Sequence, residues 1–193
     1  MKINLTWFRF QSRWWLAAVV LVGLAVWSRE AQVGGFGWPE ASRHAMDGAF
    51  LLDLIGAHPV GHLGEWSRNY FTCYPCLGIL DSDPPFFAAV EALFYAVLDV
   101  SVFTARSCVI FFTLAGTLAM YWVARQLFDR AAGILAAGLW ASLPATVLWS
   151  REVMLEVPTT AMILLCAGCY LRYQSTRSLV WLILTLMGRW AEK

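Results

Sequence analysis

Long apolar stretches separated by short polar ones run through most of the chain, and they predict membrane helices. A helix needs about 20 mainly apolar residues to cross the hydrocarbon core of a bilayer. Stretches that approach this length lie at residues 14–28, 102–127, 131–148 and 157–171. We therefore predict an all-α polytopic membrane protein, with one domain over residues 1–193 and an outer loop at residues 29–101.

A fifth apolar stretch, at residues 179–187, is too short for a complete span. As a helix it reaches only about 14 Å, which is roughly half of a hydrocarbon core. We expect that the chain stops inside this span, and that it is a fragment of a longer protein or a truncated gene product.

The first apolar stretch sets the expected orientation. Lys2, Arg9 and Arg13 precede it, and no convincing small-x-small cleavage site follows it. Because basic residues favour the cytoplasmic side, we predict an uncleaved first helix whose N-terminus is cytoplasmic.

The apolar segment at residues 84–100 is expected to lie on the membrane surface or to be re-entrant. It carries Glu91 and Asp99, and carboxylates are costly at the centre of a bilayer. If the segment does not cross, the basic clusters at residues 125–130 and 172–177 fall on the same side as the basic N-terminus. The loop at residues 150–156 then emerges on the same outer face as Glu40.

Composition agrees with a membrane protein. The chain is 60% hydrophobic and 14% charged, its mean hydropathy is +0.60, and it contains 11 Trp and 12 Phe. A soluble domain of 193 residues cannot bury so much apolar and aromatic surface. The net charge of +1 gives no reason to expect nucleic acid as a partner.

A dense polar segment at residues 38–47 stands out in this apolar chain. If Pro39 opens a helix, four polar residues at i, i+3, i+4 and i+7 share one face: Glu40, Arg43, His44 and Asp47. Ala41, Ala45, Ala49 and Leu52 line another face. We interpret this segment as a surface-lying helix with one edge of an active site. The alternative is an ordinary pairing of Glu40 with Arg43 within the helix.

The loop at residues 150–156 is the second polar cluster. It carries Arg151, Glu152 and Glu156, again an arginine with carboxylates. It is either part of the same site as Glu40 or an ordinary polar loop between two spans.

Nothing in the sequence establishes a metal or cofactor site. The three histidines, at positions 44, 58 and 62, are not spaced as metal ligands usually are. The acids at residues 81–83 precede a proline turn, where such residues are common, although they could also hold a cation. Cys73 and Cys76 form an isolated C-x-x-C on the oxidising side, so a short disulfide there stays open.

Five motifs occur in an order that resembles the polytopic glycosyltransferases that use polyprenyl-phosphate sugars, the protein mannosyltransferase and aminoarabinose transferase relatives of the GT-C fold. The first is Glu-Ala-Ser-Arg-His-Ala at residues 40–45, which resembles the family's Asp-Glu-x-Arg-Tyr-Ala motif. The others lie at residues 83–86, 98–106, 124–130 and 150–158. These short motifs are spread in order over most of the chain, from residue 40 to residue 158.

The resemblance implies a GT-C-like helical bundle in the bacterial inner (plasma) membrane. Its expected partners are a polyprenyl-phosphate-linked sugar donor and a protein or lipid acceptor on the extracytoplasmic side. Glu40 occupies the position of the family's catalytic Asp, and Glu156 matches the second acidic position. A carboxylate can take the proton of the attacking acceptor, and arginine suits the phosphate that leaves. Arg43, Arg106 and Arg151, with Glu152 beside them, are therefore expected to bind substrate or phosphate.

Three departures from the family pattern accompany this resemblance. Glu40 is one methylene longer than Asp, Ala41 replaces the second acid, and Asp83 replaces a basic or aromatic residue. Because relatives are about twice as long and use later spans for the lipid donor, we expect this chain to be inactive alone. The competing interpretation is a non-catalytic polytopic membrane protein, either a degenerate relative or a scaffold or transport subunit. Spans nearly free of internal charge count against transport.

Overall fold

The structure, a computed structural model, describes residues 6–29, 31–77 and 85–190, without the side chains of residues 6–13, 76, 189 and 190. All regular elements in these residues are helical. They are α1 (Thr6–Trp27), α2 (Pro39–Ala57), α3 (Leu63–Cys73), η1 (Pro75–Leu77), α4 (Pro85–Leu98), α5 (Val102–Leu127), α6 (Arg130–Ser142), α7 (Pro144–Trp149), α8 (Glu156–Thr176) and α9 (Leu179–Trp190).

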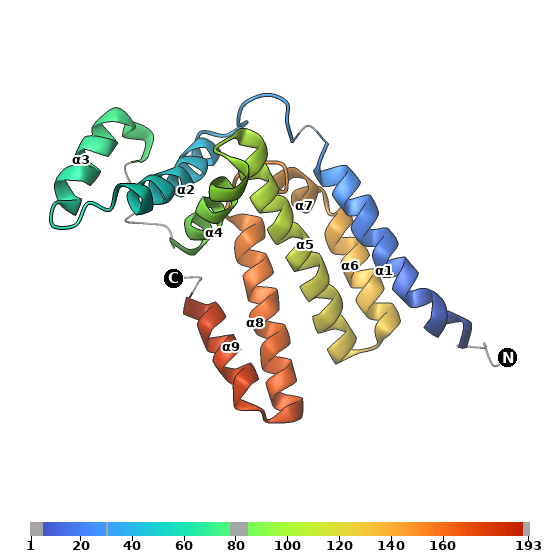
Figure 1. The fold of residues 1–193 in the computed structure, drawn as a ribbon. Coiled ribbons are helices and arrows are strands. Elements are labelled where there is room, and N and C mark those ends of the chain that lie inside the picture. Colours follow the sequence, from blue (N-terminus) through green and yellow to red (C-terminus); the bar gives the residue numbers. More distant parts are fainter. Residues whose placement is uncertain (1–5, 30, 78–84, 191–193) are drawn as a thin grey trace.

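Five helices form a bundle, and the others gather at one of its ends. Helices α1, α5, α6, α8 and α9 lie side by side, with α5 and α8 running in one direction and α1, α6 and α9 in the other, while α2, α3, α4 and α7 lie toward one end (Figure 1). We call this end, together with the loops at residues 31–38 and 150–155, the upper end. The turns that follow α5 and α8 mark the lower end. The all-α prediction is thus confirmed for the described residues.

The basic residues Arg125, Arg130, Arg172 and Arg177 belong to the helix ends and turns at the lower end. The start of α1 points to the same end (Figure 1). This separation of basic and acidic loops agrees with the orientation expected from the positive-inside rule. The side of the membrane on which each end lies stays a prediction.

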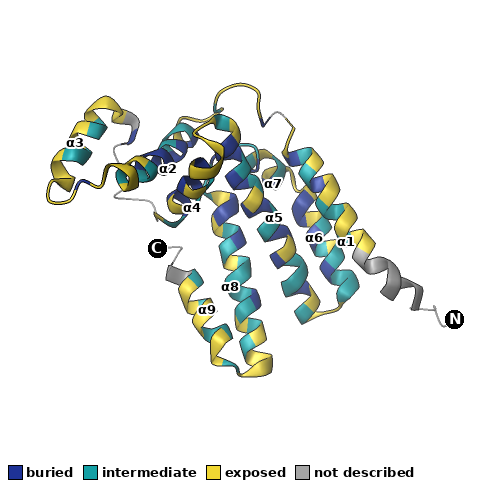
Figure 2. Cartoon of the chain, viewed as in Figure 1, coloured by how far each residue is buried: buried dark blue, intermediate teal, exposed yellow. Residues whose placement is uncertain are grey.

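Within the described residues, α5 is the one helix both long and apolar enough to cross a membrane. Its bounds equal those of the predicted second span. Shorter apolar helical segments are Trp14–Trp27, Pro85–Leu98 and Leu179–Gly188. Exposed residues cover much of the outer surface of the bundle (Figure 2), and large apolar side chains such as Leu135 and Leu139 are more than half exposed. Such a surface suits lipid better than water.

The predicted span at residues 131–148 is not one continuous helix. Helix α6 ends at Ser142, Leu143 is extended with φ −57° and ψ 130°, and α7 begins at Pro144. Proline has no N–H to continue the helical ladder, and it disfavours helical geometry in the residue before it. The 13 residues of α6 are about 20 Å long. The apolar pattern therefore overestimated the length of this helix.

Helix α5 is the centre of the bundle, and glycines let its neighbours approach it. Gly116 of α5 leaves room for the Trp140 ring, which lies 3.2 Å from where a Cβ would be. Gly168 of α8 lies under the ring of Trp122, and its carbonyl accepts a hydrogen bond from Gln126 Nε2 at 3.2 Å. Small residues at helix contacts are the usual means by which membrane helices pack closely.

Buried hydroxyls in α5 are satisfied within the helix itself. Thr113 Oγ1 donates to the Val109 carbonyl at 2.9 Å, and Thr117 Oγ1 donates to the Thr113 carbonyl at 2.8 Å. Both threonines are fully buried. Because each polar atom has a partner one turn earlier, they do not require water or another polar group in the core.

We predict that Gly168→Leu weakens the contact between α5 and α8, because the new side chain collides with the Trp122 ring. Overpacking of this kind costs about 1–3 kcal/mol, which outweighs the gain in helix propensity of about 1 kcal/mol. Denaturant titration of the protein in detergent measures the effect. Gly56→Leu is the matched control, since nothing lies within 4 Å of its Cβ position. Equal stability of the two variants would contradict the proposed packing.

Candidate active site

Helix α2 begins where the sequence predicts, with Pro39 in its first turn after the extended residue Trp38. Glu40 follows in the same turn and is exposed. A carboxylate in this position is favoured by the positive end of the helix dipole. Among the described residues the Glu40 carboxylate has no hydrogen bond or ion pair, whereas Arg43 is half-buried. Glu40 is therefore available to a ligand from outside.

The predicted polar face of α2 is divided between solvent and protein. His44 and Asp47 are buried, with exposures of 6% and 5%, and the Nδ1–Oδ2 distance between them is 3.8 Å. The expectation of one open face with four polar side chains is thus wrong for these two residues. The reason is that α4 packs along this side of α2, which a single-helix pattern cannot indicate.

A buried acid in α4 was not among the predicted site residues. Glu91 has no exposed surface, and its Oε1 lies 3.3 Å from the Tyr95 hydroxyl oxygen. Burial raises the pKa of Glu91 well above its ordinary value, and the nearby Asp47 carboxylate raises it further. In the sequence, the one sign of this buried acid was the position of Glu91 in the middle of an apolar segment. That position also argues against a membrane crossing by the segment.

Arg106 holds the loop that connects α1 to α2. Its guanidinium donates to three carbonyls, from Nη1 to Ala31 (3.4 Å) and Val33 (3.0 Å) and from Nη2 to Gly35 (2.9 Å). It also lies over the Phe36 ring, 5.9 Å from the centroid, and is only 5% exposed. Phosphate binding by Arg106 stays a prediction, but this geometry favours a structural task.

The two predicted clusters meet at the upper end of the bundle. The backbone N–H of Gly37 donates to the Glu152 carboxylate, at 3.1 Å to Oε2 and 3.3 Å to Oε1. The Trp38 and Trp149 rings lie 5.7 Å apart. A Cβ at position 37 would lie 2.9 Å from Glu152 Oε1, so glycine is what permits this approach. Segments more than 100 residues apart in the chain are therefore joined beside Glu40.

Arg151 is a half-buried cation with unused donors. Its Nη2 donates to the Val26 carbonyl at 2.9 Å, while its Nε is buried without a hydrogen-bond partner in the described residues. A guanidinium has five N–H donors in a planar fork. Arg151 thus keeps the capacity to bind an anion at the upper end of α1.

Glu156 occupies the first turn of α8 and is exposed. Its carboxylate, like that of Glu40, has no protein partner in the described part of the chain. The structure places both acids at the upper end (Figure 1), but no direct contact joins them.

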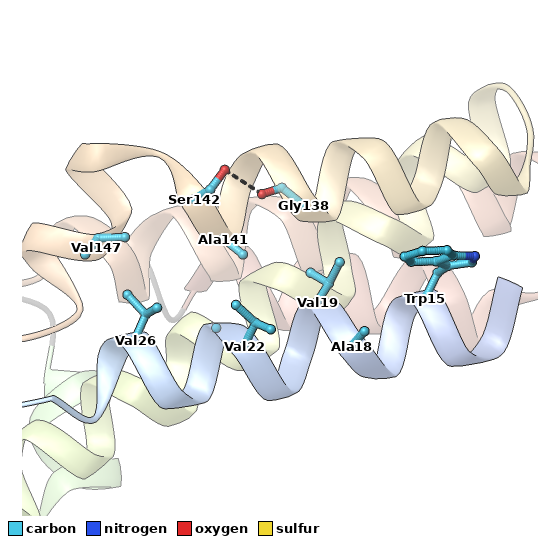
Figure 3. Close-up of a pocket in the computed structure, with 10 residues that line it drawn as sticks. Trp15, Ala18, Val19, Val22, Val26, Gly138, Ala141, Ser142 and Val147 are labelled. Atoms are coloured by element: carbon cyan, nitrogen blue, oxygen red, sulfur yellow. Dashed lines mark hydrogen bonds between the residues drawn. The ribbon is translucent and has the colours of Figure 1, made fainter.

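An apolar groove of about 480 Å³ runs between α1 and the α6–α7 segment (Figure 3). Its lining is formed by Trp15, Ala18, Val19, Val22, Gly23, Val26, Gly138, Ala141, Ser142 and Val147. The one hydroxyl among these, that of Ser142, donates to the Gly138 carbonyl at 2.8 Å. The groove therefore suits an apolar chain and not a sugar. Because Val26 also accepts the bond from Arg151, the groove ends beside that cation.

Helix α3 is joined to α2 by aromatic rings. The Phe50 ring contacts those of Trp66, Tyr70 and Phe71 at centroid distances of 5.2–5.6 Å. Tyr70 donates its hydroxyl hydrogen to Asp53 Oδ2 at 2.7 Å. Burial, together with this carboxylate, raises the pKa of Tyr70. No residue of α3 is fully buried, as expected of a helix at a surface.

No group of three potential metal ligands is found in the part of the chain that the structure describes. The acids at residues 81–83 lie outside the described residues, and so does the Pro-Pro motif that begins there. Cys73 is an exposed free thiol.

Comparison with known proteins gives one family. The model of the dolichyl-phosphate-mannose-protein mannosyltransferase family matches residues 82–190, which is more than half of the chain. No curated protein matches. No solved structure matches either. The family match includes α4 to α9 but not Glu40 and the rest of α2.

We predict that Arg106→Lys releases the loop at residues 31–36, because one ammonium cannot replace a fork that reaches three carbonyls. Loss of charged hydrogen bonds costs about 1.5–3 kcal/mol, or roughly 10–100-fold faster opening of the loop. Hydrogen–deuterium exchange of the loop amides measures this rate. Arg68→Lys, an exposed arginine in α3, is the control. Unchanged exchange of the loop amides in Arg106→Lys would exclude the proposed role of Arg106 in holding this loop.

Proposed function

Because the chain belongs to the dolichyl-phosphate-mannose-protein mannosyltransferase family, we propose that it transfers a sugar from a polyprenyl-phosphate donor to a protein or lipid acceptor. The family is one of membrane glycosyltransferases. We assign the reaction to the upper end of the bundle, on the extracytoplasmic side of the membrane. The observation that carries this assignment is the contact of Gly37 with Glu152, which joins the two acid-and-arginine clusters.

Glu40 is the proposed general base. The acceptor hydroxyl or amine attacks the anomeric carbon, the bond from that carbon to the phosphate oxygen breaks, and the acceptor proton passes to the carboxylate. Glu40 is exposed and has no hydrogen bond or ion pair with the residues that the structure describes, so an acceptor can reach it.

Arg151 is the proposed partner of the donor phosphate. It has donors to spare and lies at the outer end of the apolar groove. A lipid phosphate in this position would have its charge beside the guanidinium and its chain in apolar surroundings. Stabilisation of the departing phosphate by such a cation is a strong contribution to catalysis. Arg43, on the same helix as Glu40, is the second candidate.

Arg106 and Glu152 then act on the site through the loop before α2. Arg106 binds the carbonyls of residues 31–35, and Glu152 binds the N–H of Gly37. Both fix the path of the backbone three to nine residues before Glu40. Glu156 is the proposed second acid, at the start of α8, where it can orient the acceptor or the sugar.

We predict that Glu40→Gln lowers sugar transfer by about 10²–10⁴-fold, the usual contribution of a general base. Gln keeps the size of the side chain but cannot accept the proton. Because the chain alone is expected to be inactive, the assay is transfer of label from a polyprenyl-phosphate sugar in membranes of cells that express the complete gene.

Glu65→Gln is the matched control for this measurement, since Glu65 is also an exposed acid in the first turn of a helix. Transfer by Glu40→Gln at the level of this control would exclude Glu40 as the base. Absence of transfer by the unaltered protein with every donor tried would favour the non-catalytic alternative.

We also predict that the upper end faces the outside of the cell. Cys73 is exposed at the end of α3 and should react with a membrane-impermeant maleimide in intact cells. In a background with the other thiols removed, Ser175→Cys near the lower end should react only after permeabilisation. Ser175 is exposed and lies in the last turn of α8. The reverse labelling pattern would overturn the orientation and the location of the site.

A further inference from the structure

The proposed reaction gives no role to three buried ionisable groups of α2 and α4, which are His44, Asp47 and Glu91. Glu91 lies in the middle of α4, has no exposed surface, and faces α2, the helix that carries Glu40 and Arg43. A buried carboxylate is unfavourable unless its charge is neutralised or fully hydrogen-bonded. Its presence at this contact therefore needs a physical explanation.

Gly48 of α2 provides the space that Glu91 occupies. A Cβ at position 48 would lie 2.8 Å from Glu91 Cγ and 2.9 Å from its Cβ. Ala41, Ala45 and Ala49 continue this small-residue side of α2 and are all buried. The two helices thus approach each other with the acid enclosed between them.

The hydrogen bonds around Tyr95 indicate which atom supplies a proton. The Tyr95 hydroxyl oxygen lies 2.9 Å from the Ala45 carbonyl and 3.3 Å from Glu91 Oε1. The hydroxyl has one hydrogen, and the shorter contact with the Ala45 carbonyl uses it. With that hydrogen used, the 3.3 Å contact is a hydrogen bond when Glu91 is protonated and donates to the Tyr95 oxygen, whereas an ionised Glu91 would compete with the Ala45 carbonyl for the hydroxyl hydrogen.

Burial, the largest effect, and the Asp47 carboxylate raise the pKa of Glu91, and they outweigh hydrogen bonds from Tyr95 and the Gly48 backbone, which lower it. Asp47 of α2 is a buried carboxylate whose repulsion disfavours a second negative charge, and it has His44 as its own neighbour. From α5, the Cys108 thiol faces Glu91. The groups that act on Glu91 are thus the Asp47 carboxylate, the Tyr95 hydroxyl, the Cys108 thiol and the backbone of Gly48.

We propose that Glu91 is a positioning residue that carries a proton and, as a neutral acid, docks α2 onto α4. The bridge runs from the Glu91 carboxyl group through the Tyr95 hydroxyl to the Ala45 carbonyl. Ionisation of Glu91 removes the donated hydrogen and puts a charge beside Asp47, so α2 separates from α4. The consequence for catalysis rests on the proposed role of Glu40, but the docking itself does not.

The sign of the pH effect follows from proton linkage. In the docked state Glu91 keeps its proton, and in the undocked state it has its ordinary pKa of about 4.5. Docking is therefore strongest at acidic pH and weakens as pH rises through the range above 4.5, until Glu91 ionises in the docked state as well. Within this range each pH unit increases the undocked fraction about tenfold.

Hydrogen–deuterium exchange of the full chain in detergent tests the docking directly. Exchange rates of the α2 amides, corrected for the intrinsic effect of pH, should rise up to tenfold per pH unit in the wild type. In Glu91→Gln they should not rise, because the amide N–H replaces the carboxyl hydrogen at every pH. Glu65→Gln is the control and should behave as the wild type does. A pH dependence that is the same in Glu91→Gln and the wild type would overturn the proposal.

An infrared measurement does not depend on any variant folding well. At neutral pH the wild type should show the carbonyl band of a protonated carboxylic acid that resists exchange of its proton with solvent. Its absence from the wild type, or its persistence in a folded Glu91→Gln protein, would contradict the assignment.

Transfer activity separates this inference from the proposed function. If both hold, transfer by the wild type falls at alkaline pH and transfer by Glu91→Gln extends to higher pH. If hydrogen–deuterium exchange supports docking while no transfer is found, the inference that Glu91 is protonated is supported and the proposed function is wrong. If transfer is present and its alkaline limit is unchanged in Glu91→Gln, the positioning role fails and the transferase stands.

Discussion

The arrangement of the upper end depends on how closely α2 approaches α4. Helix α2 carries Glu40 and Arg43, yet little of it touches the central helix α5. Its position is set instead by small residues that face α4 and by the hydroxyl of Tyr95 on the Ala45 carbonyl. Hydrophobic contact alone would allow α2 to shift along α4, because the small alanine side chains do not interdigitate strongly with those of the facing helix. The polar bridge is directional, so it fixes the register of the two helices as well as their distance.

A second set of contacts transmits this position to the rest of the bundle. The loop before α2 is bound on one side by Arg106 from α5 and on the other by Glu152 from the loop before α8. Both side chains use backbone groups of the loop. The path of residues 31–37 also depends on two glycines of the loop: Gly34, whose φ of 75° lies in the left-handed region, and Gly37, where a Cβ would meet Glu152. The loop is therefore held by its partners and by these two positions together.

Much of this fold could be predicted from the apolar pattern, because membrane helices have a length set by the bilayer. The bounds of α5 were obtained in this way, whereas the start of α2 was predicted from Pro39 and the spacing of the polar residues that follow it. The break before Pro144 was missed because apolarity on both sides concealed the loss of one backbone donor.

The site was harder to predict. A helical period shows which residues share a face, but it does not show what packs against that face. For this reason His44 and Asp47 were expected at the surface, and Glu91 was taken as a mark of a surface helix. The meeting of residues 37 and 152 was expected only as a shared membrane face. Its geometry depends on side chains that no local pattern connects.

The upper end of α1 has a consequence for how the protein is made. Trp27 Nε1 donates to the Ala141 carbonyl at 3.3 Å, and the Val26 carbonyl accepts from Arg151 at 2.9 Å. These partners are separated by 114 and 125 residues, so ribosomes finish α1 long before either exists. During synthesis the Trp27 indole N–H therefore lacks its partner until residue 141 has been made, whereas the Val26 carbonyl can already accept from the Arg29 backbone N–H at 3.4 Å. The hydrogen bonds between α1 and the rest of the bundle therefore form only after α6 and α7 have been synthesised.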